Sequence, residues 1–238
     1  MSSSSLLGSM SGGTDIVSCF ALSNPTLPVY SGEIQCRGLG MAVDTVNEKG
    51  ESLVNRKGEL VCRKPFPSMP IGFWGEDGQK RYHDAYFETM KGVWFHGDYS
   101  LLTERGGVII FGRSDTTLNP GGVRIGSAEL YRVLDHITAI LDSIVVSAER
   151  GQGEQIVLFV KLQPSLCLDD GLIRSIQKRI RNDCSPRHVP KEIFQVNDIP
   201  YTLSGKKVEK AVKDILEGRA VLNRSVLRNP ESLDEFKR

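Results

Sequence analysis

The 238-residue sequence predicts an α+β fold in two parts, and three observations support this. Up to about residue 112, short apolar runs lie between glycines and prolines, which is typical of strands joined by loops. After residue 115, apolar residues recur at helical spacing and alternate with short strand-like runs. The resulting order of helix, strand, strand, helix, strand, helix predicts a small α+β unit.

The first part contains three expected strands and one expected hairpin. Residues 104–107, Glu-Arg-Gly-Gly, directly precede an apolar run and predict a tight turn with its return strand. A cluster of three prolines at positions 65, 67 and 70 excludes a central strand from that segment. The expected strands are the apolar runs Ile16–Phe20, Glu59–Cys62 and Val108–Phe111.

The second part opens with a predicted helix over residues 127–141, with Ser127 as a possible N-cap. Two strand-like runs follow, at Ile144–Val146 and Ile156–Val160. The apolar residues that predict this helix share a spacing of three or four: Leu130, Val133, Leu134, Ile137, Ile140 and Leu141.

The remaining elements are a helix over residues 172–180, a strand at Ile193–Val196 and a last helix over 208–216, which Gly218 could cap. Aspartates before the first of these helices and arginines near its end match the helix dipole. A polar, Gly-rich boundary lies within 113–122. We therefore expect domains at 1–114 and 115–218, and a polar tail over 219–238 on the surface.

Composition excludes several classes of protein. A net charge of +1, from 30 basic and 29 acidic residues, provides no basic field for nucleic acid, so no such partner is expected. The apolar runs are too short to span a bilayer, and residues 1–10 do not resemble a signal peptide. Five cysteines, with no two at CxxC spacing, argue against a disulfide framework and indicate a reducing compartment.

Four segments contain residues suited to chemistry, and the first is Ser9–Thr14 beside Asp15. Small residues let backbone amides approach an anion, and one carboxylate suits Mg²⁺ bound to substrate phosphates. The segment lacks the Gly-Lys-Ser/Thr of a P-loop. The plain alternative is a flexible loop.

The second segment is His96-Gly97-Asp98, in which a carboxylate could accept hydrogen bonds from both hydroxyls of a ribose. The alternatives are an aspartate that caps a turn and a hydrogen-bonded structural histidine. The third segment, residues 112–124, holds two arginines and three glycines. Guanidinium groups suit phosphate oxygens, and the same composition suits an interdomain linker.

The fourth segment is Thr202–Lys207, a turn before the last helix in which glycine precedes two lysines. It could present a compact positive charge on a mobile loop. The alternative is the solvated basic start of a helix.

In this order, the segments resemble the C-terminal part of the adenylate-forming enzymes, the acyl-CoA synthetase family. The resemblance covers essentially the whole chain. Its markers are SGGTD (Ser11–Asp15), GEL (Gly58–Leu60), HGD (His96–Asp98), GRSDTTLNPGGVRIGSAE (Gly112–Glu129) and SGK (Ser204–Lys206). Within the family, the chain looks most like the acetoacetyl-CoA synthetase branch because of the SGGTD form, His96, Ile199–Lys206 and Asn229–Leu233. Most relatives carry aromatic-Gly-x-Thr-Glu in place of SGGTD.

The resemblance implies a reaction in two halves. ATP and a carboxylic acid, here acetoacetate, give an acyl-adenylate and pyrophosphate, and the thiol of CoA then displaces AMP. The small C-terminal domain rotates between the halves. ATP, Mg²⁺ and CoA are thus the expected cofactors and co-substrates of the intact enzyme.

By position, the resemblance assigns the nucleotide to residues from three of these segments. Thr14 would contact the α-phosphate and Asp15 would lie near Mg²⁺, although Asp15 is one methylene shorter than the usual glutamate. Asp98 would bind both ribose hydroxyls. Arg113 would contact the ribose, and Arg124 would contact the triphosphate.

The resemblance assigns further roles to the linker and the small domain. Asp115 would be the hinge, Gly121 and Gly122 would line the path of the pantetheine, and Arg181 would lie near the CoA nucleotide. Lys206 would bridge the substrate carboxylate and the α-phosphate during adenylation.

The phosphate loop of the family's large N-terminal domain has no counterpart before Ser11. We therefore expect the chain to be the C-terminal part of a cytosolic acetoacetate–CoA ligase and to be inactive alone. The alternatives are part of an acetate or propionate ligase, or a non-catalytic protein that binds a nucleotide or a partner. The sequence leaves the oligomeric state open.

Overall fold

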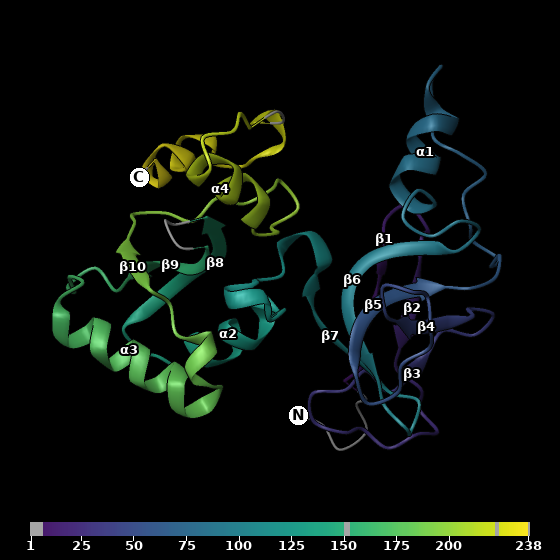
Figure 1. Cartoon of the computed structure of the whole chain (residues 1–238), viewed down its shortest axis with the longest axis horizontal. Coiled ribbons are helices and arrows are strands. Elements are labelled where there is room, and N and C mark those ends of the chain that lie inside the picture. Colours follow the sequence, from purple (N-terminus) through teal and green to yellow (C-terminus); the bar gives the residue numbers. More distant parts are fainter. Residues whose placement is uncertain (1–6, 150–152, 222–223, 238) are drawn as a thin grey trace. The chain divides into compact units, whose positions relative to one another are not determined.

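The structure is a computed structural model that describes residues 7–149, 153–221 and 224–237. The chain divides into two compact units, Met1–Ser114 and Asp115–Arg238 (Figure 1). The first unit contains two β-sheets and the second contains one, and the buried core clusters of the two units are separate. The predicted α+β class is confirmed.

The first unit is built on a four-stranded antiparallel sheet with the order β4-β5-β6-β7. The expected hairpin lies between β6 and β7, where the amide of Gly106 donates to the carbonyl of Thr103 at 2.9 Å. A smaller sheet has the order β1-β2-β3, and one helix, α1, was not predicted. The bounds are β1 Ser11–Gly13, β2 Ser18–Leu22, β3 Cys36–Arg37, β4 Val43–Val46, β5 Lys57–Cys62, α1 Gly78–Tyr86, β6 Trp94–Leu102 and β7 Val108–Arg113.

Aromatic side chains fill the core of the first unit. Trp94, at the start of β6, is 2% exposed and lies edge-on to Phe66, with ring centroids 5.3 Å apart. Phe20 of β2 meets Phe66 in the same geometry. From α1, the ring of Tyr86 stacks on Trp94 with centroids 3.7 Å apart, which explains why this polar helix packs against the sheet.

The second unit follows the predicted order of helices and strands. Its sheet has the order β10-β9-β8, with β8 antiparallel and β10 parallel to the central β9. Parallel pairing requires a crossover, which α3 provides. The bounds are α2 Ser127–Leu134, β8 Ile140–Glu149, β9 Glu154–Leu162, α3 Asp170–Asp183, β10 Glu192–Gln195 and α4 Glu209–Leu216.

Strand β9 is buried on both faces, and its side chains alternate between two clusters. Ile156, Leu158 and Val160 pack with α2 and α3, while Val157 and Phe159 pack with α4. Figure 1 shows the helices on opposite faces of this sheet. This double burial explains why the run reads as continuously apolar rather than alternating.

The first helix of the second unit is shorter than predicted. It ends at Leu134, and Ile140 and Leu141 belong to β8. The segment Ile-Thr-Ala-Ile contains β-branched residues that suit a strand, although their spacing also fits a helix. Gly126, rather than Ser127, occupies the N-cap, where its amide donates to the Glu129 side chain at 3.0 Å.

The expectation of a surface tail over residues 219–238 is wrong. Leu233 and Phe236 are fully buried, and the Phe236 ring lies 4.7 Å from that of Phe159. The segment also pairs with the chain before α4, since Thr202 and Leu227 form an antiparallel bridge. A few apolar residues of this polar segment complete the core of the second unit. The average composition of the segment does not reveal their burial. No helix among the described residues is long and apolar enough to cross a membrane.

Candidate functional site

A buried carboxylate, Asp98, lies at the centre of a polar cluster in the first unit. Asp98 is 8% exposed and stands directly opposite Arg113 in the register of β6 and β7. Nη1 of Arg113 lies 3.2 Å from Oδ1 of Asp98, and the Ser11 hydroxyl donates to Oδ2 at 3.4 Å. Cross-strand pairing therefore sets the direction of this carboxylate.

The glycine between His96 and Asp98 is required by this arrangement. Gly97 has a φ of +78°, a region that side chains disfavour. A Cβ at this position would lie 2.7 Å from Nη2 of Arg113. Nη1 of Arg113 also donates to the His96 carbonyl at 3.0 Å, so the guanidinium lies across the strand where only glycine leaves space.

The His96 ring contacts the aromatic rings of Phe20 and Trp94 and lies next to the Asp98 carboxylate. Its ring lies 4.8 Å from that of Phe20, and Nε1 of Trp94 donates to Nδ1 at 3.4 Å. Burial lowers the pKa of His96, more than the neighbouring Asp98 carboxylate raises it. The neutral ring accepts at Nδ1, so its proton is on Nε2, 3.6 Å from Oδ2 of Asp98. This geometry matches the structural role considered from the sequence.

Thr14 and Asp15 lie in the turn after β1, and both are exposed. The hydroxyl of Tyr86 donates to Oδ2 of Asp15, across 71 residues of sequence. Burial, with the help of Asp15, raises the pKa of Tyr86. Sequence reasoning missed Tyr86, whose only signal is its place four residues after Tyr82 on a polar helix.

In the second unit, Lys206 and Lys207 have opposite surroundings. Lys206 is exposed, and no side chain among the described residues pairs with its ammonium. Lys207 is half-buried: its Nζ donates to the Ser143 carbonyl at 2.7 Å and lies 2.9 Å from Oδ1 of Asp142. Lys206 is thus solvated, as the alternative for this segment expects, whereas Lys207 is bound within the second unit.

The other predicted residues of the second unit are dispersed. Asp115 lies in a short 3₁₀ helix, Ser114–Thr116, and is exposed. Gly121 and Gly122 have φ values of +60° and +79°, with open space where a Cβ would be, so conformation rather than crowding favours glycine. Arg181 is exposed near the end of α3. Arg124 is partly buried, next to the bridge between Leu118 and Ile125.

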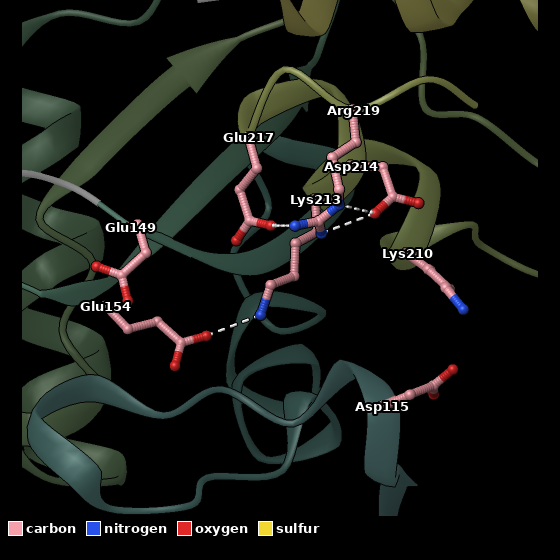
Figure 2. Close-up of a pocket in the computed structure, with 8 residues that line it drawn as sticks. All are labelled: Asp115, Glu149, Glu154, Lys210, Lys213, Asp214, Glu217 and Arg219. Carbon is pink, nitrogen blue, oxygen red and sulfur yellow. Dashed lines mark hydrogen bonds and ion pairs between the residues drawn. The ribbon is translucent and has the colours of Figure 1, made fainter.

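Asp115 also lines a charged pocket of about 380 Å³ within the second unit (Figure 2). Nζ of Lys213 lies 2.8 Å from Oε1 of Glu154, and the guanidinium of Arg219 bridges Asp214 and Glu217. These ion pairs account for much of the charge in the pocket. Its lining residues are Asp115, Glu149, Glu154, Lys210, Lys213, Asp214, Glu217 and Arg219.

Comparison with known proteins gives a consistent result. The chain is 50% identical over 230 residues to an acetoacetyl-coenzyme A synthetase of Rhizobium meliloti, covering 97% of this chain and 35% of that protein. It is 48% identical over 234 residues to an acetoacetyl-CoA synthetase of Danio rerio, covering 98% and 35%. It spans about a third of the length of these relatives. No protein-family profile matches it.

Solved structures agree with the sequence relatives. Acetoacetyl-CoA synthetase from Streptomyces lividans matches with a TM-score of 0.90 and 45% identity, over 97% of this chain and 35% of that one. ATP-bound MatB from Rhodopseudomonas palustris matches with a TM-score of 0.74 at 17% identity, which shows a shared fold. In sequence and in fold, the chain therefore corresponds to the C-terminal third of the acetoacetyl-CoA synthetases, and the resemblance to the adenylate-forming acyl-CoA synthetases is confirmed.

Proposed function

We propose that this chain supplies part of the nucleotide site and the mobile small domain of an AMP-forming acetoacetate–CoA ligase in the cytosol. The observation that carries the proposal is the buried Asp98 carboxylate, aimed by Arg113 from the neighbouring strand. The names of the relatives supply the acid, acetoacetate. Catalysis requires the rest of the ligase, since the chain spans about a third of the relatives.

Asp98 is suited to bind a ribose. Its Oδ1 is already oriented by Arg113, while Oδ2 accepts a long hydrogen bond from the Ser11 hydroxyl, at 3.4 Å, and lies 3.6 Å from Nε2 of His96. A ribose hydroxyl can replace that weak bond, and bonds to a charged carboxylate are about twice as strong as neutral ones. Arg113 would then contact the same ribose.

The residues near Thr14 fit a magnesium–nucleotide complex. Mg²⁺ bound to nucleotide phosphates needs only one or two protein carboxylates, and Asp15 is exposed and able to provide one. The Tyr86 hydroxyl donates to Oδ2 of Asp15, and Oδ1 would be the oxygen that contacts the ion. When bound, the ion would neutralise phosphate charge. Thr14 and Arg124 would contact the phosphates themselves.

Lys206 is the proposed catalytic residue. Adenylation builds negative charge on the α-phosphate, and a positioned ammonium stabilises that charge more in the transition state than in the ground state. Its exposure leaves it available to the substrate. Rotation about Asp115 would move this loop between the two half-reactions. Gly121, Gly122 and Arg181 are the proposed contacts of CoA.

The proposal is tested by replacing the corresponding region of the Streptomyces lividans acetoacetyl-CoA synthetase with this chain. We expect the joined protein to show acetoacetate-dependent exchange between ATP and pyrophosphate, and to form acetoacetyl-CoA. Residues 1–238 alone should show no exchange. A joined protein that folds and binds ATP but catalyses neither half-reaction would overturn the proposal. A preference for acetate or propionate would correct the acid.

A further inference from the structure

The loop that presents Lys206 is held at both ends by one carboxylate, that of Asp142 on β8. Tyr201, before the loop, donates its hydroxyl to Oδ2 of Asp142 at 2.6 Å. Lys207, after the loop, places Nζ 2.9 Å from Oδ1. Tyr201 and Lys207 also face each other across an antiparallel bridge. We call Asp142, Tyr201 and Lys207 the loop clamp.

The backbone between these ends has a defined shape. The Thr202 amide donates to the Lys206 carbonyl at 2.8 Å, and the Gly205 amide donates to the Thr202 carbonyl at 2.9 Å. The Lys206 amide donates to the Thr202 hydroxyl at 3.0 Å. Gly205 has a φ of +79°, which suits this tight turn. The loop is therefore a small closed structure from which the Lys206 side chain projects into solvent.

The clamp is tied to the core of the unit. Nζ of Lys207 also donates to the Ser143 carbonyl at 2.7 Å and lies 4.4 Å from the ring centroid of Tyr131. The Tyr131 hydroxyl donates to Glu209, in the first turn of α4, at 3.0 Å. One end of the loop is thus fixed to β8 and to a helix on each face of the sheet.

We propose that Asp142 is a positioning residue for adenylation, which holds the Lys206 loop in its working shape without contacting substrate. This inference rests on the proposed role of Lys206. A reacting group that is displaced by about 1 Å can lose about 10²-fold in rate, so anchoring both ends of a five-residue turn has a direct consequence for the chemistry.

The chain offers a matched control for this proposal. Glu154 likewise accepts from one lysine, Lys213 at 2.8 Å, and one hydroxyl, that of Ser147. The exposed fractions of the two carboxylate side chains are similar, 22% for Asp142 and 19% for Glu154. Asp142→Asn and Glu154→Gln each remove one charge with little change in volume. Only the first variant should disturb the loop.

The first measurement is amide hydrogen exchange on the 238-residue chain. In Asp142→Asn, we expect the amides of Thr202, Gly205 and Lys206 to exchange about tenfold faster or more, the effect of losing about 1.4 kcal/mol of local stability. In Glu154→Gln they should exchange as in the unmodified chain. Unchanged protection in Asp142→Asn, or equal loss in both variants, would overturn the clamp.

The second measurement uses the two half-reactions of the joined ligase. Asp142→Asn should slow adenylation by about tenfold to a hundredfold. Its KM for ATP, and the conversion of preformed acyl-adenylate to thioester, should stay within about twofold. In a Lys206→Ala background, Asp142→Asn should have no further effect, since both changes act through one group.

These outcomes separate the inference from the proposed function. Faster exchange in the loop with normal adenylation would overturn the positioning role and leave the function standing. Normal adenylation by Lys206→Ala would overturn the role of Lys206 and, with it, the positioning role. The exchange experiment would still decide whether Asp142 holds the loop.

Discussion

The two units hold their functional side chains in different ways. In the first unit, Asp98 is buried and its carboxylate is already oriented by Arg113. In the second unit, backbone hydrogen bonds hold the loop around Lys206, while the side chain of this lysine is exposed. A side chain that binds a ligand binds more tightly when it is oriented before the ligand arrives. A side chain that must reach a reacting group needs a fixed backbone and a terminal group that is free to move.

The largest expected effect concerns the core beneath the lysine loop. Phe236→Ala should lower the free energy of unfolding of the second unit by about 3–5 kcal/mol, because the ring is fully buried. Circular dichroism during urea unfolding measures this change. Val226→Ala is the control from the same segment, at 48% exposure, and should change stability by less than about 0.5 kcal/mol. Equal losses of stability in Phe236→Ala and Val226→Ala would mean that the C-terminal segment lies on the surface.

The next effect separates the two lysines. In the joined ligase, Lys206→Ala should slow adenylation by about 10²–10³, the typical cost of removing one such donor. Thioester formation from preformed acyl-adenylate should stay within a few-fold of normal. Lys207→Met should instead lower stability and loosen the loop, with a smaller loss of adenylation. If Lys206→Ala slows both half-reactions equally, the lysine is a general anion contact rather than a residue of the first step.

A smaller effect is expected at the prearranged carboxylate. Asp98→Ala should raise the KM for ATP by about tenfold or more, since each hydrogen bond to a charged group is worth about 1.5–3 kcal/mol. Calorimetric titration of ATP into the joined protein gives the matching change in Kd. Asp84→Ala, an exposed aspartate of the same unit, is the control. An unchanged Kd in Asp98→Ala would remove this residue from the nucleotide site.

The smallest effect is a difference in pH dependence between the units. Burial lowers the pKa of His96 in the first unit and raises the pKa of Glu209 in the second. Below about pH 6.5 the unfolded chain binds a proton at His96 that the native unit resists, so acidification destabilises the first unit. The pKa of Glu209 is raised in the native second unit, so this unit takes up a proton at Glu209 before the unfolded chain does, and that uptake stabilises it as the pH falls.

This difference can be measured because both tryptophans, Trp74 and Trp94, lie in the first unit. From pH 7 to pH 5, the free energy of unfolding obtained from urea titrations followed by tryptophan fluorescence should fall, by at most about 1.4 kcal/mol per pH unit. The protection of the β9 amides, corrected for the intrinsic exchange rate at each pH, should not fall. His96→Gln should remove the pH dependence of the fluorescence midpoint, and a persistent slope would assign it to other groups.

The sequence predicts those parts of the molecule whose partners are nearby in the chain. The aspartates at the start of α3, the Gly106 turn and the glycine after α4 all act within a few residues, and all are present. Asp169 in addition caps α3, where its side chain accepts from the Leu172 amide. Which side chains of β9 face which cluster cannot be read from the sequence, because both faces of the strand are covered and the run is apolar throughout. Helix α1 was missed because its residues are mostly polar, and what packs it on the sheet is the contact of Tyr82 and Tyr86 with Trp94 at the start of the next strand.

The candidate site divides in the same way. Asp98 and Lys206 stand in short motifs, and their types alone suggest binding and charge stabilisation. The residues that support such side chains are not in these motifs and lie far apart in the sequence. Asp142 is 59 residues from Tyr201 and 65 from Lys207, and Tyr86 is 71 residues from Asp15. Such pairs are set by topology. The buried segment around Phe236 was missed for the same reason.

The topology of the second unit also has a consequence for how it folds. Strands β8 and β9 form a local hairpin, while β10 can join only after α3 has crossed over. Contacts between distant residues form late, because closing a long loop costs entropy before any bond compensates for it. The lysine loop bonds to Asp142 on that hairpin and to the segment around Leu227. We therefore expect the loop to be assembled last, so that Lys206 is held in place only when the second unit is fully folded. With the role proposed for Lys206, a partly folded ligase would form no acyl-adenylate.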